Sequence, residues 1–202
     1  MNEKLDGLRV AILVANDFEQ VEMVVPRKVL DDAGAQTFLI APSEPLMVDN
    51  LEVVHPARCE VQGIHHDKPG DMFPVSLPLE MANANDFDAL LLPGGVMNAD
   101  QLRIIDKAKE FVQSFDQNMK PIAVICHGPW TLVSAGLMVG RTITSWPSLK
   151  DDIRNAGGNW VNQEVCEDRN WVSSRAPQDL PAFNKAMLRL FSQFTGHMRK
   201  AA

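Results

Sequence analysis

Three short apolar runs restrict the fold of this chain more than any other feature. They occupy residues 9–14, 88–92 and 120–125, and each gives way at once to polar or glycine-containing sequence. The runs are continuous rather than alternating, which is typical of strands that are buried on both faces of a parallel sheet. Helical spacing follows them along the chain. The pattern therefore predicts an α/β fold, a mostly parallel sheet with helices on both faces.

The remaining elements are predicted from turn and helix signals. Strands are expected at 36–40, 143–145, 161–165 and 171–173, and helices at about 100–115, 128–135 and 148–156. The first helix should end at Gly34, and its apolar positions are Val21, Val24, Val25 and Val29. The last helix should start near Asp179, which is its expected cap. Residues 58–86 are rich in Pro and Gly and should form an irregular excursion on the sheet edge or over the site. We expect one domain, residues 1–202, with its core at about 9–194.

Composition excludes several classes of function. The 202 residues are 46% hydrophobic and carry a net charge of −7. No basic stripe is present, so nucleic acid is not an expected partner. The sequence shows no leader and no apolar run of membrane length, which predicts a cytoplasmic protein without a membrane partner. Cys59, Cys126 and Cys166 lack Cys-x-x-Cys spacing, and the contiguous His65, His66 and Asp67 favour a solvated loop. Neither a metal nor a cofactor is expected.

Cys126 is the candidate nucleophile. It lies where the apolar run 120–125 ends and the next helix begins. The first backbone N–H groups of a helix have no intrahelical partners, and their partial positive charge favours a thiolate. We therefore expect a lowered thiol pKa. The alternative is a small buried hydrophobic residue, a role that free cysteines often have. Cys59 and Cys166 lack a helix-start setting and are interpreted as structural.

Other candidate site residues lie at the ends of neighbouring predicted strands. Glu19 could act as a base or as a protonated donor to sulfur, and Gly94 and Gly95 could offer backbone N–H groups to an oxyanion. His127 could contribute its imidazole or its backbone N–H. Each has a simpler alternative: a first-turn carboxylate for Glu19, an ordinary turn for the glycines, and a packed histidine at a helix start for His127.

An ordered set of motifs resembles the DJ-1/PfpI superfamily, and the match is closest to its PfpI-like intracellular protease and general stress protein branch. The motifs are Phe18-Glu-Gln-Val-Glu22, Leu92-Pro-Gly-Gly95, Ile125-Cys-His-Gly-Pro129, Ala135-Gly136, Thr144-Ser-Trp-Pro147 and Trp171-Val-Ser-Ser174. The resemblance implies a flavodoxin-like three-layer sandwich with Cys126 at a nucleophile elbow and Glu19 hydrogen-bonded to its sulfur. It also implies a homodimer or hexamer, in which Asp100 is the nearest match to an acid that reaches His127 of a neighbouring subunit.

Three functions are compatible with such a thiol. The first is a stress-related enzyme that acts through Cys126 on a small carbonyl, a glycation adduct or a peptide amide. The second is a non-catalytic sensor or chaperone that responds to oxidation of Cys126. The third, glutamine amidotransfer, is disfavoured. Val124 stands where that elbow needs glycine, and His197 is the only histidine after His127.

Overall fold

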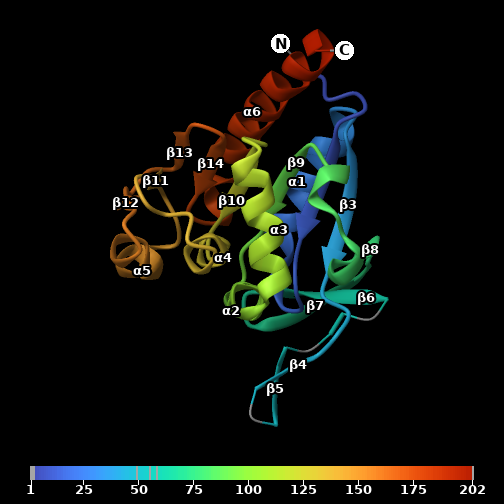
Figure 1. Ribbon diagram of the computed structural model, residues 1–202, viewed down its shortest axis with the longest axis vertical. Coiled ribbons are helices and arrows are strands. Elements are labelled where there is room, and N and C mark those ends of the chain that lie inside the picture. Colours follow the sequence, from blue (N-terminus) through green and yellow to red (C-terminus); the bar gives the residue numbers. More distant parts are fainter. Residues whose placement is uncertain (1–2, 49, 55, 58, 202) are drawn as a thin grey trace.

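A seven-stranded sheet forms the centre of the computed structural model, which describes residues 3–48, 50–54, 56–57 and 59–201 (Figure 1). The strand order is β13 (Val165–Asp168), β14 (Trp171–Ser174), β10 (Ile122–Ile125), β9 (Ala89–Leu92), β1 (Arg9–Leu13), β3 (Gln36–Ala41) and β8 (Leu77–Pro78). Every neighbouring pair is parallel except β13 and β14. The predicted α/β class and mostly parallel sheet are confirmed.

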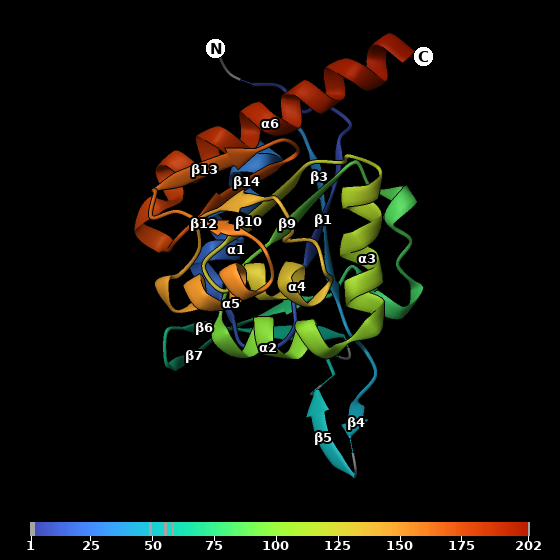
Figure 2. The same ribbon diagram turned by 60° about the vertical axis from the view of Figure 1, so that its left-hand side comes forward.

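Helices cover both faces of this sheet (Figure 2). Along β1, Val10 and Ile12 pack in one core cluster with residues of α1 (Gln20–Asp32) and α6 (Leu180–Ala201). Ala11 and Leu13 pack in a second cluster with α3 (Asp106–Gln117), α4 (Pro129–Ser134) and α5 (Lys150–Asn155). Successive residues of a strand point to opposite faces, so one buried strand serves two cores. The result is the expected three-layer sandwich.

The buried face of α1 differs from the one that the sequence pattern indicated. Val24 and Val25 are each 36% exposed, whereas Met23, Pro26 and Leu30 are buried. The buried residues recur at three- and four-residue intervals, as one helical face requires. Val21 is half-buried and packs against the core, so the apolar positions expected for this helix belong only in part to its buried face. Glu22 lies next to Met23 and is therefore carried into the interior.

Two further predictions were wrong in detail. The helix expected at about 100–115 is divided into α2 (Val96–Ile104) and α3, because Ile105 is extended and its carbonyl accepts the first N–H groups of α3. No strand occupies 161–164. Instead β12 (Asn159–Trp160) pairs with β11 (Thr142–Ile143), and β13 begins at Val165.

Asp179 lies in a 3₁₀ turn (Pro177–Asp179) just before α6, and its carboxylate accepts from Arg175. The other 3₁₀ turns are η1 (Leu79–Met81), η2 (Ala84–Asp86) and η3 (Pro147–Leu149).

Residues 59–86 contain strands and 3₁₀ turns rather than the irregular excursion that was predicted. β6 (Glu60–His65) and β7 (Lys68–Pro74) form an antiparallel hairpin, and β6 also pairs with β2 (Phe18–Glu19). Figures 1 and 2 both place this hairpin across one end of the sheet, beside α2. A second hairpin, β4 (Leu46–Val48) and β5 (Leu51–Val54), projects from the body of the molecule. Within the described ranges, no helix is both long and apolar enough to cross a membrane.

Candidate functional site

Cys126 lies at a sharp corner between β10 and α4. Its φ is +61°, a left-handed backbone that non-glycine residues adopt rarely and that recurs at active sites. Its N–H donates to the carbonyl of Ser174, and its own carbonyl accepts from the Trp146 N–H. These bonds fix the corner between β14 and the segment after β11. The side chain is 7% exposed. The strand-to-helix corner that the sequence predicted is present.

Glu22, rather than Glu19, is the carboxyl that contacts the sulfur. Glu22 is fully buried, its Oε2 accepts a 2.9 Å hydrogen bond from the Gly94 N–H, and its carboxyl is hydrogen-bonded to the Cys126 thiol. Its Oε1 has no hydrogen-bond partner among the described residues. The sequence contains a signal for this position that was overlooked. An acidic residue four positions before Pro26 and eight before Leu30 lies on the same, buried face of α1.

Glu19 was expected on the sulfur and is found elsewhere. It ends β2, and its Oε2 accepts from the His66 N–H at 3.1 Å while its Oε1 lies 3.5 Å from His66 Nδ1. The reason is the pairing of β2 with β6, which places Glu19 opposite Ile64 and beside the tip of the β6–β7 hairpin. Glu19 still lines the same cavity as Cys126. His66 lies in the hairpin turn that was interpreted as a solvated loop, and Glu19 is its partner.

The electrostatic interaction between Glu22 and Cys126 favours a state in which the two groups share one proton. Burial raises the pKa of Glu22 from 4.5 to about 8, although hydrogen bonds from Gly94 and Cys126 oppose the shift. Burial also raises the pKa of the Cys126 thiol, and the negative charge of Glu22 raises it further. The helix-start N–H groups lower it, as expected from the sequence, but they do not outweigh burial. Two anions in this dry site would repel strongly. At neutral pH the pair therefore keeps at least one proton.

The His127 ring lies next to the thiol. Its Nδ1 is 3.2 Å from Cys126 Sγ, and its Nε2 is 3.5 Å from Ser148 Oγ. The ring stacks on Trp146 and meets Trp130 edge-on. Burial lowers the pKa of the imidazole, so the ring is neutral at pH 7 and can accept a proton. Sequence adjacency alone did not require this contact; the left-handed corner at Cys126 brings the two side chains together.

The Gly94–Gly95 turn fits against Cys126. A Cβ at Gly94 would lie 2.6 Å from the Cys126 Cβ, and one at Gly95 would lie 2.5 Å from the Asp17 carbonyl. The Gly95 and His127 N–H groups are hydrogen-bonded to the sulfur. The Gly94 N–H is not available as the predicted oxyanion donor, because it binds Glu22. Asn98, which the sequence analysis missed, is fully buried, and its amide donates to the Gly94 carbonyl.

The cavity around Cys126 measures about 280 Å³. Its walls are mainly apolar and come from α2, the β6–β7 hairpin, and the segments that carry Cys126 and Trp146. The lining residues are Glu19, Glu22, Ile64, His66, Gly95, Val96, Met97, Cys126, His127, Trp146 and Pro177. Asp100 is exposed on α2 and does not line this cavity. Its role across a subunit interface stays a prediction.

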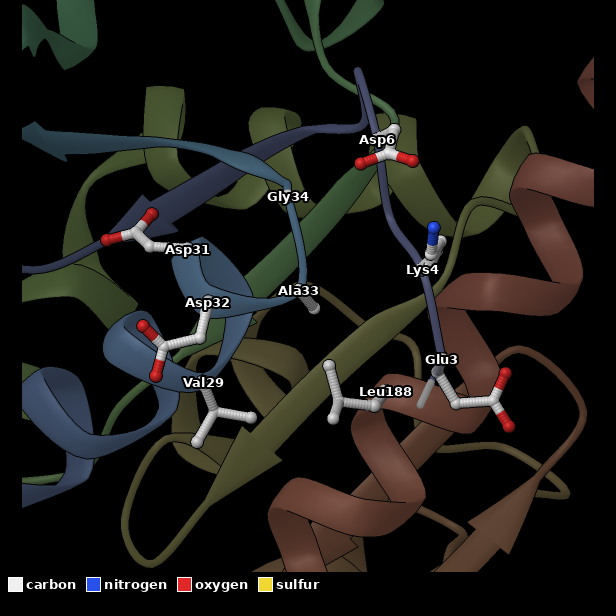
Figure 3. A pocket seen from close by; sticks show the side chains of 9 residues that line it. All are labelled: Glu3, Lys4, Asp6, Val29, Asp31, Asp32, Ala33, Gly34 and Leu188. Atoms are coloured by element: carbon white, nitrogen blue, oxygen red, sulfur yellow. The ribbon is translucent and has the colours of Figure 1, made fainter. Parts of the chain in front are cut away.

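A second cavity lies at the opposite end of the sheet (Figure 3). It measures about 400 Å³ and opens between the segment before β1, the end of α1 and α6. Its carboxylates belong to Glu3, Asp6, Asp31 and Asp32, and Figure 3 shows that they point in different directions rather than toward one centre. Across the described ranges, no group of three or more His, Cys, Asp or Glu side chains could hold a metal ion. This cavity lacks a nucleophile.

The fold and the thiol corner together define a class of protein. The structure of Drosophila melanogaster DJ-1beta superposes with a TM-score of 0.75 at 22% identity, covering 96% of this chain and 97% of that one. This likeness shows a shared fold. A buried thiol at a strand-to-helix elbow, with a buried carboxyl against it, is the site that the fold supports here.

The family follows from the sequence comparisons. The model of the DJ-1/PfpI family matches residues 8–190, and the chain belongs to that family. A deglycase of Pyrococcus abyssi is 39% identical, over 91% of this chain and 99% of the relative. General stress protein 18 of Bacillus subtilis is 34% identical, over 93% of this chain and 99% of the relative. The resemblance noted from the motifs is confirmed.

The raised pKa of Glu22 leads to a prediction about stability. In a Cys126→Ala variant only Glu22 of the pair titrates. A carboxyl with pKa 4.5 unfolded and about 8 folded binds more protons in the folded state between these values. The free energy of unfolding should therefore fall as pH rises through this window, by up to about 1.4 kcal/mol per pH unit. The measurement is the urea midpoint from pH 5 to 8. The same series in Cys126→Ala/Glu22→Gln is the control, and equal slopes in the two variants would contradict the shifted pKa.

Proposed function

We propose that this chain is a cysteine-dependent enzyme that acts on a small carbonyl compound, a glycation adduct or a peptide amide, with Cys126 as the nucleophile. The observation that carries the proposal is the convergence of four groups on one sulfur. These are the Glu22 carboxyl, the His127 imidazole at 3.2 Å, and the Gly95 and His127 N–H groups. A buried thiol that was only packing material would not need a left-handed corner or a buried acid beside it.

A reaction with methylglyoxal illustrates how these groups would work. His127 takes the proton of the Cys126 thiol, and the sulfur adds to the aldehyde carbon; a C–S bond forms, the C=O π pair moves to oxygen, and that oxygen takes a proton from Glu22, which Glu22 regains from His127. His127 removes the C1 proton and returns it to C2 while the C1 hydroxyl proton passes to the C2 oxygen, which converts the hemithioacetal to a thioester of lactate. Water then cleaves the C–S bond and restores the thiol. The sum is methylglyoxal plus water giving lactic acid, so no oxidant or reductant is required.

The cavity favours a small substrate over an extended peptide. Its volume of about 280 Å³ is at the low end of the range for ligand pockets, and its walls are largely apolar. The neutral His127 beside the thiol supplies a proton acceptor at pH 7. The deglycase name of the Pyrococcus abyssi relative points in the same direction. Among the proposed substrates, we therefore favour the small carbonyls and their adducts.

Oxidation sensing is the second candidate function, and the position of Glu22 favours it. Because the pKa of Glu22 is raised to about 8, its carboxyl is largely protonated at neutral pH. It could therefore donate a hydrogen bond to an oxygen of a Cys126 sulfinate. Such an oxidised thiol would record oxidative load or switch on a chaperone activity without turnover. The two functions need the same residues. They differ in the outcome: the enzyme releases a product, whereas the sensor keeps the oxidised sulfur.

A single experiment tests both functions. The purified chain is incubated with methylglyoxal and, separately, with a peptide amide, and its intact mass is recorded before and after mild peroxide. Lactate formation over many turnovers by the wild type, and none by Cys126→Ala, is the result expected of the enzyme. A gain of two oxygens at Cys126 without turnover of either substrate would replace the enzymatic proposal with the sensor.

A further inference from the structure

The mouth of the Cys126 cavity contains a carboxylate that the reaction above does not use. We propose that Glu19, fixed by His66, forms a subsite for a positively charged nitrogen, so that the site accepts neutral and cationic carbonyl compounds and rejects anionic ones. The substrate class is thereby narrowed to small dicarbonyls and carbonyl adducts of amines or guanidines. This inference rests on the proposed function, whose reacting atoms it leaves unchanged.

Glu19 is held firmly in place. Its backbone N–H donates to the Gly94 carbonyl at 3.2 Å, which connects it to the turn beside the nucleophile. Its side chain is 11% exposed, and both oxygens face His66. A carboxylate has about four acceptor positions, so two contacts with one residue leave capacity for another donor. The His66 ring is 81% exposed, so an incoming cation can replace it at Oε1.

The hairpin that carries His66 is itself clamped to α1. The Gln20 amide donates to Asp71 Oδ2 and accepts from the Asp71 N–H, both at 2.7 Å. Gly63 and Gly70 allow this approach, because a Cβ at either would lie within 3.1 Å of the Gln20 side chain. This clamp is local to the cavity and joins the hairpin to the first turn of the helix that carries Glu22. The position of the subsite is therefore set by the fold.

Apart from His66, which already contacts Glu19, no described side chain that lines the cavity opposes the charge of Glu19. The described lining residues include no lysine or arginine. Burial lowers the pKa of His127 and raises that of Glu22, so both are largely uncharged at pH 7. Ile64, Val96 and Met97 line the walls and exclude part of the water. In such surroundings a single carboxylate acts on a nearby charge more strongly than it would in bulk water.

The walls also indicate what carries the cation. Aliphatic and aromatic side chains beside one carboxylate suit an alkyl stem that ends in an ammonium or guanidinium group. Met97 and Trp146 are 49% and 40% exposed at this mouth. A glycated arginine or lysine would place its carbonyl carbon toward Cys126 and its nitrogen toward Glu19. A carboxylate such as glyoxylate would instead meet the same charge and be repelled.

Charged thiol reagents test this subsite without depending on turnover. Cys126 is modified at pH 7 with 2-aminoethyl, methyl and 2-sulfonatoethyl methanethiosulfonate; the thiolate displaces methanesulfinate and forms a mixed disulfide. Rates at Cys126 are read by peptide mapping and divided by those of glutathione. We expect the cationic reagent to react at least about 10-fold faster than the anionic one. In Glu19→Gln the ratio should fall to within about 3-fold, because the charge is lost and the shape is kept.

The control is Glu60→Gln, an exposed glutamate on the same hairpin that does not line the cavity; it should keep the wild-type ratio. Equal rates for the two charged reagents in the wild type would overturn the proposal. A preference that survives in Glu19→Gln would also overturn it, as would failure of all three reagents to reach Cys126. A protein that shows the charge preference but no turnover would contradict the proposed function and leave the subsite standing.

Discussion

Replacing Glu22 by glutamine is expected to lower kcat/KM for methylglyoxal by about 10²- to 10⁴-fold, the usual range for loss of a positioned proton donor. Glutamine keeps the shape of the side chain and can still donate an N–H to sulfur. It cannot release a proton to the oxygen that forms when the thiolate adds. Glu22 is fully buried and contacts the Cys126 thiol, so bulk water is a poor substitute for it as the proton donor.

The same variant should change how the thiol titrates. In the wild type, Glu22 and Cys126 interact strongly, so the rate of alkylation by iodoacetamide should rise with pH in two steps that belong to the pair. Glu22→Gln should leave one step. Glu19→Gln is the matched control, since Glu19 binds His66 rather than the sulfur, and it should keep both steps. If Glu19→Gln removes a step and Glu22→Gln does not, the assignment of the buried acid is wrong.

The second large effect concerns stability and lies away from the thiol. Arg141→Met is expected to lower the free energy of unfolding by about 3–5 kcal/mol, because it leaves a partly buried carboxylate without its cation. Arg141 is 4% exposed, and its Nη2 lies 2.5 Å from Asp116 Oδ1. Its guanidinium also stacks 4.1 Å above the Trp171 ring and donates to Asn170. Three chain segments, including its own, therefore meet at this one side chain.

Urea unfolding gives the measurement, and the chain provides a matched control. Arg169 is 56% exposed and lies 3.6 Å from Asp168, so Arg169→Met should change stability by less than about 1 kcal/mol. Adding Asp116→Asn to Arg141→Met should recover part of the loss, because it removes the unpaired charge. Equal losses in Arg141→Met and Arg169→Met would show that the buried network is not a major source of stability.

Much of the site could be predicted because its signals are local. The strand that ends at Ile125, the thiol that follows and the helix that starts at Pro129 are consecutive in the chain. The two glycines after β9 are likewise local. The error at Glu19 has a different origin. Glu19 was selected for its place near the end of a predicted strand and from the family resemblance, whereas the acid that meets the sulfur is decided by which face of α1 is buried, and that face carries Glu22.

The sequence by itself therefore determined the class of fold, the order of most elements and the position of Cys126, because hydrophobic runs and helix-start signals act over a few neighbouring residues. Only the tertiary structure decided which acid meets the sulfur, how the β6–β7 hairpin closes the cavity, and in which direction the thiol pKa moves. These depend on burial and on contacts between segments far apart in the chain, and desolvation, the largest influence on both pKa values, exists only once the chain has packed.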